Sequence, residues 1–154
     1  MKLSRVKRDA RLTLLGRPWW VPVLGAVVTA TYSFAMVGIG SVGVNLGAAG
    51  YAGGIVGGAV AGAALGTNWH DGMMAGLRAG LHGALAVVGV FVVGTFAVLY
   101  LQSGLPFPYW SSALGAIVAM FLVPVYAFTG ALAGSLGVLC RRFVLPRRYN
   151  PPAY

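Results

Sequence analysis

The sequence predicts an all-α integral membrane protein, a four-helix bundle with glycine-mediated close helix packing. Hydrophobic residues make up 58% of the 154 positions, and the mean hydropathy is +0.82. Charged residues make up only 8%, whereas a soluble domain has about 25%. Four apolar stretches also occur, each long enough for the roughly 20 residues that a membrane helix needs. These observations exclude an ordinary soluble globular domain.

Short polar or proline-containing breaks separate the four expected membrane spans. The first span ends at a Ser41–Gly43 break, and the second ends at a polar turn over residues 67–71. The third ends before Pro106 and Pro108, which cannot continue a regular helix. We expect Asp71 to be the N-cap of the third span. The four spans are, in order, residues 19–40, 44–66, 73–101 and 111–139.

The distribution of cations predicts the orientation of these spans. Six of the 11 Lys and Arg residues precede the first span and four follow the last. Cations concentrate on the cytoplasmic side of membrane helices, so both termini are expected there, in a multi-pass protein of the cytoplasmic membrane. The four-span domain, 18–140, then lies between a basic amphipathic leader, 1–17, and a basic tail that contains prolines, 141–154. A cleaved signal peptide ending near Ser33–Ala35 is the competing interpretation of the N-terminus.

Basic side chains near both ends are expected to contact anionic lipid head groups. The leader places apolar residues on one helical stripe and most of its cations elsewhere, as in helices that lie on a membrane surface. The expected lipid-surface contacts are Lys2, Arg5, Lys7, Arg8, Arg11, Arg141 and Arg142.

Glycine spacing is the strongest internal pattern. In the second span glycine recurs every four residues, a neighbouring stripe of Gly and Ala has the same step, and the third span begins with the same interval. Residues four apart share a helix face, and small residues there allow backbones of membrane helices to approach closely. We therefore expect the second span to be central, packed by the third and at least one other helix. A stripe could instead drive self-association. The expected helix-packing residues are Gly50, Gly54, Gly58, Gly62, Gly66, Gly72, Gly76 and Gly80.

The two glycine-rich stretches, Gly47–Gly62 and His70–Ala84, resemble the glycine-rich helical hairpin of small four-span membrane proteins from halophilic archaea, a family of unknown function. The similarity covers roughly a quarter of the chain. It implies an archaeal cytoplasmic membrane and a four-helix hairpin architecture, and it supplies no catalytic residue.

A few polar residues within the spans are candidates for a polar or ligand site. Arg78 and His82 are four apart, and Asp71 lies seven residues before Arg78, so the three share one helix face. Arg78 can be a snorkelling anchor or a partner of Asp71, or it can belong to a ligand, lipid or proton site. For His82, a hydrogen bond to a neighbouring helix competes with a proton-linked role. Asn45 and Tyr51 complete the candidates.

The residue inventory argues against an enzyme. The chain has no Glu, its only cysteine is Cys140, and no metal-ligand spacing recurs, so we expect no catalytic residue, metal site or cofactor. Nucleic-acid binding lacks a supporting motif. The leading hypothesis is a structural or accessory subunit of a membrane complex, or a homo-oligomer. The alternative is a small oligomeric channel or transporter with a polar site near Asn45, Tyr51, Arg78 and His82.

Overall fold

The computed structural model describes residues 19–40, 52–65, 68–103 and 109–144. In this part of the chain every element is a helix, so the protein is all-α, as predicted. The elements are α2 (Trp20–Gly40), α4 (Gly53–Leu65), α5 (Trp69–Ser103) and α6 (Tyr109–Val144).

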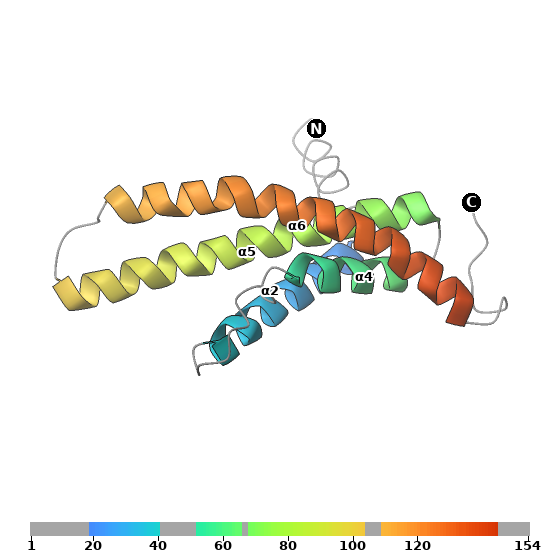
Figure 1. Cartoon of the computed structure of the whole chain (residues 1–154), viewed down its shortest axis with the longest axis horizontal. Coiled ribbons are helices and arrows are strands. Elements are labelled where there is room, and N and C mark those ends of the chain that lie inside the picture. Colours follow the sequence, from blue (N-terminus) through green and yellow to red (C-terminus); the bar gives the residue numbers. More distant parts are fainter. Residues whose placement is uncertain (1–18, 41–51, 66–67, 104–108, 145–154) are drawn as a thin grey trace, which may run out of the picture.

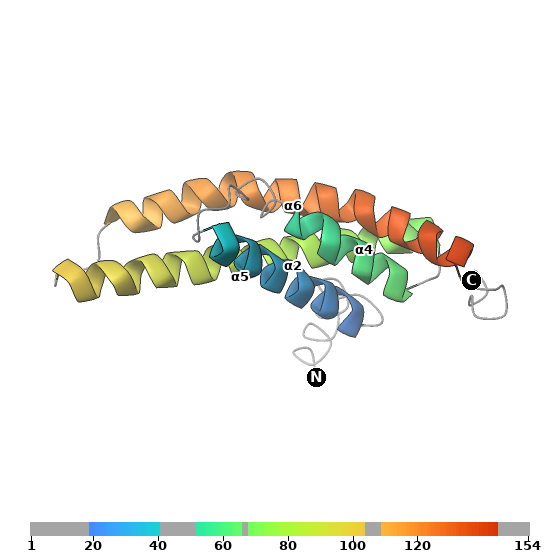
Figure 2. The same cartoon turned by 60° about the horizontal axis from the view of Figure 1, so that its bottom comes forward.

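The two longest helices, α5 and α6, form an antiparallel hairpin, and α2 and α4 lie against one half of it (Figures 1 and 2). The short α4 contacts α2, α5 and α6. This confirms the expectation that the second apolar segment packs against the third and at least one other. The other half of the hairpin extends past α2 and α4 (Figure 1).

The direction of each helix follows from its closest neighbours. Gly58 of α4 lies beside Gly130 of α6, and Gly62 lies beside Gly134, so α4 and α6 run parallel. By the same reasoning α2 and α5 run parallel, because Gly25 lies beside Ala79 and Thr29 beside Gly83. Since α5 and α6 are antiparallel, the four helices alternate in direction along the chain. The end of α4, the start of α5 and the end of α6 therefore meet at one end of the bundle.

Helix α5 begins earlier than predicted. The amide of Gly72 donates a 3.0 Å hydrogen bond to the carbonyl of Asn68, which closes the first helical turn over residues expected to form a polar turn. Asn68 therefore takes the N-cap position. The assignment of Asp71 as N-cap was wrong, because Asp71 lies inside the first turn of α5. A carboxylate in this position still favours the helix, since it faces the positive end of the helix dipole.

Helix α6 is also longer than predicted, since it continues to Val144 instead of ending at residue 139. Its last turn contains Arg141 and Arg142, two cations that favour the negative end of the helix dipole. The first four residues of the predicted tail, 141–144, are thus helical. Pro124 lies inside α6, which changes direction near its middle (Figure 1). A proline has no amide hydrogen to donate to the preceding turn, which explains a bend there.

The described helices differ in length. Helices α5 and α6 contain stretches, Trp69–Val98 and Gly115–Val144, that are long and apolar enough to cross a membrane. The apolar stretches Trp20–Met36 and Gly53–Leu65 are shorter. The 13 residues of α4 rise about 20 Å. Residues 44–51 and 66 of the predicted second span lie outside the described part of the chain.

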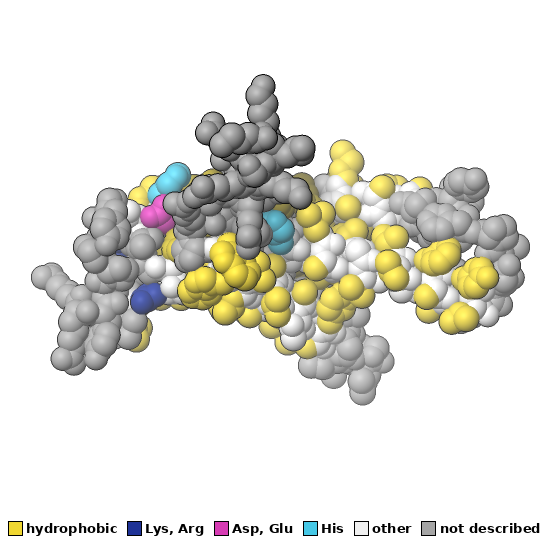
Figure 3. All heavy atoms as spheres, turned by 180° about the vertical axis from the view of Figure 1, so that it is seen from behind, with side chains coloured by type: hydrophobic (Ala, Val, Ile, Leu, Met, Phe, Trp, Pro, Cys, Tyr) yellow, Lys and Arg dark blue, Asp and Glu magenta, His cyan; other side chains and the backbone are white. Residues whose placement is uncertain are grey.

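The interior of the described bundle consists mainly of small side chains, and most of the large apolar side chains lie outside. Alanines 61, 75, 79 and 84 are at most 5% exposed, whereas Phe121 and Phe128 are 69% and 66% exposed. Hydrophobic side chains occupy much of the face shown in Figure 3. The core therefore depends on close approach of backbones more than on interlocking of large side chains.

Candidate functional site

Helix α4 presents two different glycine faces to two different partners. Gly53 and Gly57 face α2, where a Cβ added to Gly57 would lie 3.0 Å from the Thr29 Cβ. Gly58 faces α6, where an added Cβ would lie 2.6 Å from the Cα of Gly130. Ordinary Cβ contacts are 3.4–4 Å, so neither face can hold a larger residue without displacing a neighbouring helix.

The same geometry continues between α5 and α6. A Cβ on Gly76 would lie 2.9 Å from the Cα of Gly134, and one on Gly80 would lie 2.8 Å from the carbonyl carbon of Tyr126. Gly72 faces Val138 and Gly134. By contrast, Cβ atoms added at two other α5 glycines, Gly89 and Gly94, would have nothing within 4 Å.

Six of the eight glycines expected at helix contacts lie in the described part of the chain, and all six face α6. These are Gly54, Gly58, Gly62, Gly72, Gly76 and Gly80. The other two, Gly50 and Gly66, lie outside the described residues.

A buried hydroxyl pair joins α2 to α6. Ser33 Oγ and Tyr126 Oη are 3.1 Å apart, and these residues are 3% and 2% exposed. Close by, the hydroxyl of buried Thr29 donates a 2.9 Å hydrogen bond to the carbonyl of Gly25 in its own helix. These hydroxyls are satisfied by protein partners, so their arrangement indicates packing.

The polar site predicted around Arg78 is only partly within the described residues, since Asn45 and Tyr51 lie outside them. Arg78 and His82 are half-buried on α5, and Asp71 is exposed two turns before Arg78. The His82 ring nitrogen Nδ1 lies 2.7 Å from the carbonyl oxygen of Arg78. A carbonyl oxygen only accepts hydrogen bonds, so Nδ1 is the donor here and carries the hydrogen. The expectation that His82 bonds to a neighbouring helix was wrong, because its partner belongs to its own helix.

Arg141 has a role that the sequence analysis did not predict. Its Nη1 donates hydrogen bonds to the carbonyl oxygens of Ala63 and Ala64, at 2.8 and 3.1 Å. These carbonyls belong to the last turn of α4, where no further helical amide follows to bond them. A cation also favours this end of a helix dipole. The half-buried Arg141 therefore caps α4 from α6, a contact that the expected lipid-surface role does not include.

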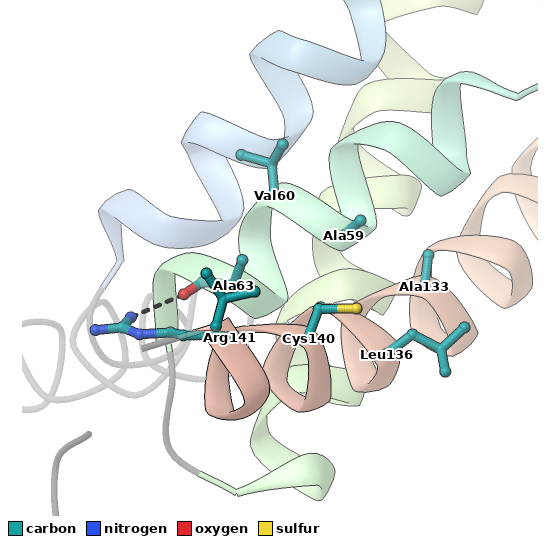
Figure 4. Close-up of a pocket in the computed structure, with 9 residues that line it drawn as sticks. Ala59, Val60, Ala63, Ala133, Leu136, Cys140 and Arg141 are labelled. Atoms are coloured by element: carbon teal, nitrogen blue, oxygen red, sulfur yellow. Dashed lines mark hydrogen bonds between the residues drawn. The ribbon is translucent and has the colours of Figure 1, made fainter. Parts of the chain in front are cut away.

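A groove of about 620 Å³ lies between α4 and α6 next to this cap (Figure 4). Its walls are apolar except for Arg141. Val60 and Ala63 line it from α4, and Leu136 and Cys140 line it from α6. Figure 4 shows the Arg141 guanidinium at one end of the groove and Ala133 and Leu136 toward the other.

The described residues contain no group of three or more His, Cys, Asp or Glu side chains that could hold a metal ion. Of the expected lipid-surface residues, only Arg141 and Arg142 are described, and Arg142 is exposed at the end of α6. The five leader cations lie outside the described ranges.

No protein-family model matches this chain, and neither the curated proteins nor the solved structures contain a significant match to it. Its function must therefore be inferred from its own residues and their arrangement.

Proposed function

We propose that this chain is a multi-pass integral membrane protein, a compact four-helix bundle with a structural or accessory-subunit role. The observation that carries the proposal is the inverted distribution of side-chain size, with mostly alanine and glycine inside and Phe, Leu and Met outside. Water-soluble proteins rarely expose contiguous apolar surface of this extent. In a bilayer the same surface contacts lipid, and helix association depends on close backbone contact.

Helix lengths and charge positions support the same interpretation. The 35 and 36 residues of α5 and α6 rise about 52 and 54 Å, more than the hydrocarbon core of about 30 Å. Such helices cross a bilayer with tilt or with their ends among the head groups. The described cations Arg141 and Arg142 lie at the end of the bundle where α4 ends and α5 begins. The positive-inside rule assigns that end to the cytoplasm.

The glycine contacts favour a structural role over transport. The described helices approach one another so closely at Gly58, Gly76 and Gly130 that not even a methyl group fits between them. Transport would instead require a polar path through the bundle. The assembly that these contacts build would serve as a subunit of a membrane complex or associate with further copies of itself.

Topology mapping tests the proposal. In a Cys140→Ala chain, single cysteines would be placed after residue 145, near residue 105 between α5 and α6, and near residue 67 between α4 and α5. They would be probed in intact cells with a thiol reagent that does not cross membranes. Labelling is expected only near residue 105, with the other two positions labelled after the membrane is opened. Labelling of the C-terminal position in intact cells would overturn the orientation. Recovery of the chain in the soluble fraction would overturn the membrane assignment.

Mild-detergent purification from the native membrane tests the subunit role. A co-purifying membrane protein or a defined oligomer supports it. A monomer that carries ions across liposomes would overturn it in favour of a channel.

A further inference from the structure

The groove between α4 and α6 combines an apolar trough with a single cationic end. Of the residues that line it, Arg141 alone is charged, and the others are Ala, Val, Leu, Gly and Cys. From Ala133 to Val144 the groove follows 12 residues of α6, and the helix rises about 16 Å between the first and the last of them. This length is close to half of the roughly 30 Å hydrocarbon core, the depth of one leaflet. The dimensions suit an acyl chain that enters from the cytoplasmic side.

The guanidinium of Arg141 retains donors for an anion. Its Nη1 is occupied by the two α4 carbonyls, and its Nε is buried without a hydrogen-bond partner among the described residues. Because Nε is enclosed by the chain's own atoms, an anion cannot reach it. Nη2 carries two further N–H donors, and charge-assisted hydrogen bonds from a guanidinium to phosphate are among the strong ones.

We propose that this groove binds one anionic phospholipid, with an acyl chain along α4 and α6 and its phosphate on Nη2 of the Arg141 guanidinium. This inference rests on the proposed membrane location. Charge complementarity selects the occupant, because the positive charge of Arg141 complements an anionic phosphate and the trough offers an acyl chain only apolar contacts. The bound lipid would join the last turn of α4 to α6 through the same side chain that caps α4.

Photo-crosslinking in vesicles tests the site. The full chain would be reconstituted in phosphatidylcholine vesicles containing a trace of either phosphatidylglycerol or phosphatidylcholine with a diazirine in its acyl chain. The crosslinked peptides would then be mapped by mass spectrometry. The phosphatidylglycerol probe is expected to label groove residues of α4 and α6 in preference to the exposed face of the α5–α6 hairpin. The phosphatidylcholine probe is expected to label both surfaces without that preference.

Matched variants distinguish lipid binding in the groove from attraction of anionic lipid by any cation near the membrane surface. Arg141→Gln keeps one amide donor for the α4 carbonyls but loses the charge, so groove labelling by phosphatidylglycerol should fall about tenfold, the effect of one charge-assisted bond pair. Arg142→Gln removes the same charge one residue away and should leave groove labelling within about twofold, as a rim charge does. Ala59→Phe, which fills the trough, should reduce labelling with Arg141 intact. Excess inorganic phosphate should displace nothing.

The outcomes distinguish this proposal from the one on which it rests. Equal labelling of the groove by both probes, or an equal loss in Arg141→Gln and Arg142→Gln, would overturn the lipid site while leaving the membrane protein intact. Labelling of neither the groove nor the hairpin by either probe would overturn membrane insertion itself. Displacement by inorganic phosphate would replace the lipid with a soluble anion.

Discussion

Replacing Gly58 by alanine tests whether the helices depend on close backbone contact. The added Cβ would lie 2.6 Å from the Cα of Gly130, about 1 Å nearer than ordinary contact, so α4 and α6 would have to separate locally. Overpacking of this kind costs about 1–3 kcal/mol. The same substitution improves helix propensity by roughly 1 kcal/mol. The net effect is expected to range from neutral to about 2 kcal/mol of destabilisation.

Gly89→Ala provides the matched control, because a Cβ there meets nothing within 4 Å while the gain in propensity is the same. The difference between the two variants therefore isolates the contact and should be about 1–3 kcal/mol in favour of Gly89→Ala. Unfolding of each variant by sodium dodecyl sulfate in mild-detergent micelles, followed by circular dichroism, measures it. A Gly58→Ala protein as stable as Gly89→Ala would refute the close-packing argument.

Three further substitutions test other parts of the structure. Tyr126→Phe removes the hydroxyl pair with Ser33 and should cost about 0.6–1 kcal/mol in the same unfolding assay. In the Ser33→Ala background it should cause no added loss of stability. Additive losses would show that the two hydroxyls act separately. Val90→Asp places a charge on the outer face of α5. In a glycosylation-based insertion assay, the free energy of membrane insertion should become less favourable by about 2.5–3.5 kcal/mol. At the surface of a soluble protein, the same substitution would change stability by less than about 0.5 kcal/mol. Arg141→Gln should speed amide hydrogen exchange in the last turn of α4 and leave α2 unchanged. Equal exchange in both proteins would mean that the cap is dispensable.

The helical class was predictable because composition and apolar run length constrain it strongly. The four-residue spacing of Gly54, Gly58 and Gly62 places them on one helix face. This face can be recognised from the sequence without knowing which helix packs against it. The spacing does not identify the partner as α6, because residues such as Gly130 and Gly134 carry the same pattern as glycines elsewhere in the chain. The choice of partner depends on how four helices fit together.

The helix ends and the Arg141 cap were harder to predict. Residues 69–71 are polar or aromatic and look like a turn, but one backbone bond from Gly72 to Asn68 draws them into α5. Arg141 and Ala63 are 78 residues apart, so no local pattern connects them. Two features together could have indicated the cap. Alternating spans bring the C-terminal ends of the second and fourth spans together, and the carbonyls at the end of a helix need hydrogen-bond donors. His82 was misjudged because its ring reaches the carbonyl one turn back.

The α6 residues that contact α4 are separated from it in the sequence by the whole of α5. A helix of 13 residues that is rich in glycine is too short and too flexible to persist alone, and its neighbours on α6 begin at Tyr126. A ribosome that has just completed α4 must still add more than half of α5 and α6 before those neighbours leave the exit tunnel. Until that moment the segment has only α2 and α5 as partners, so its packing is completed late in biogenesis, when α6 emerges.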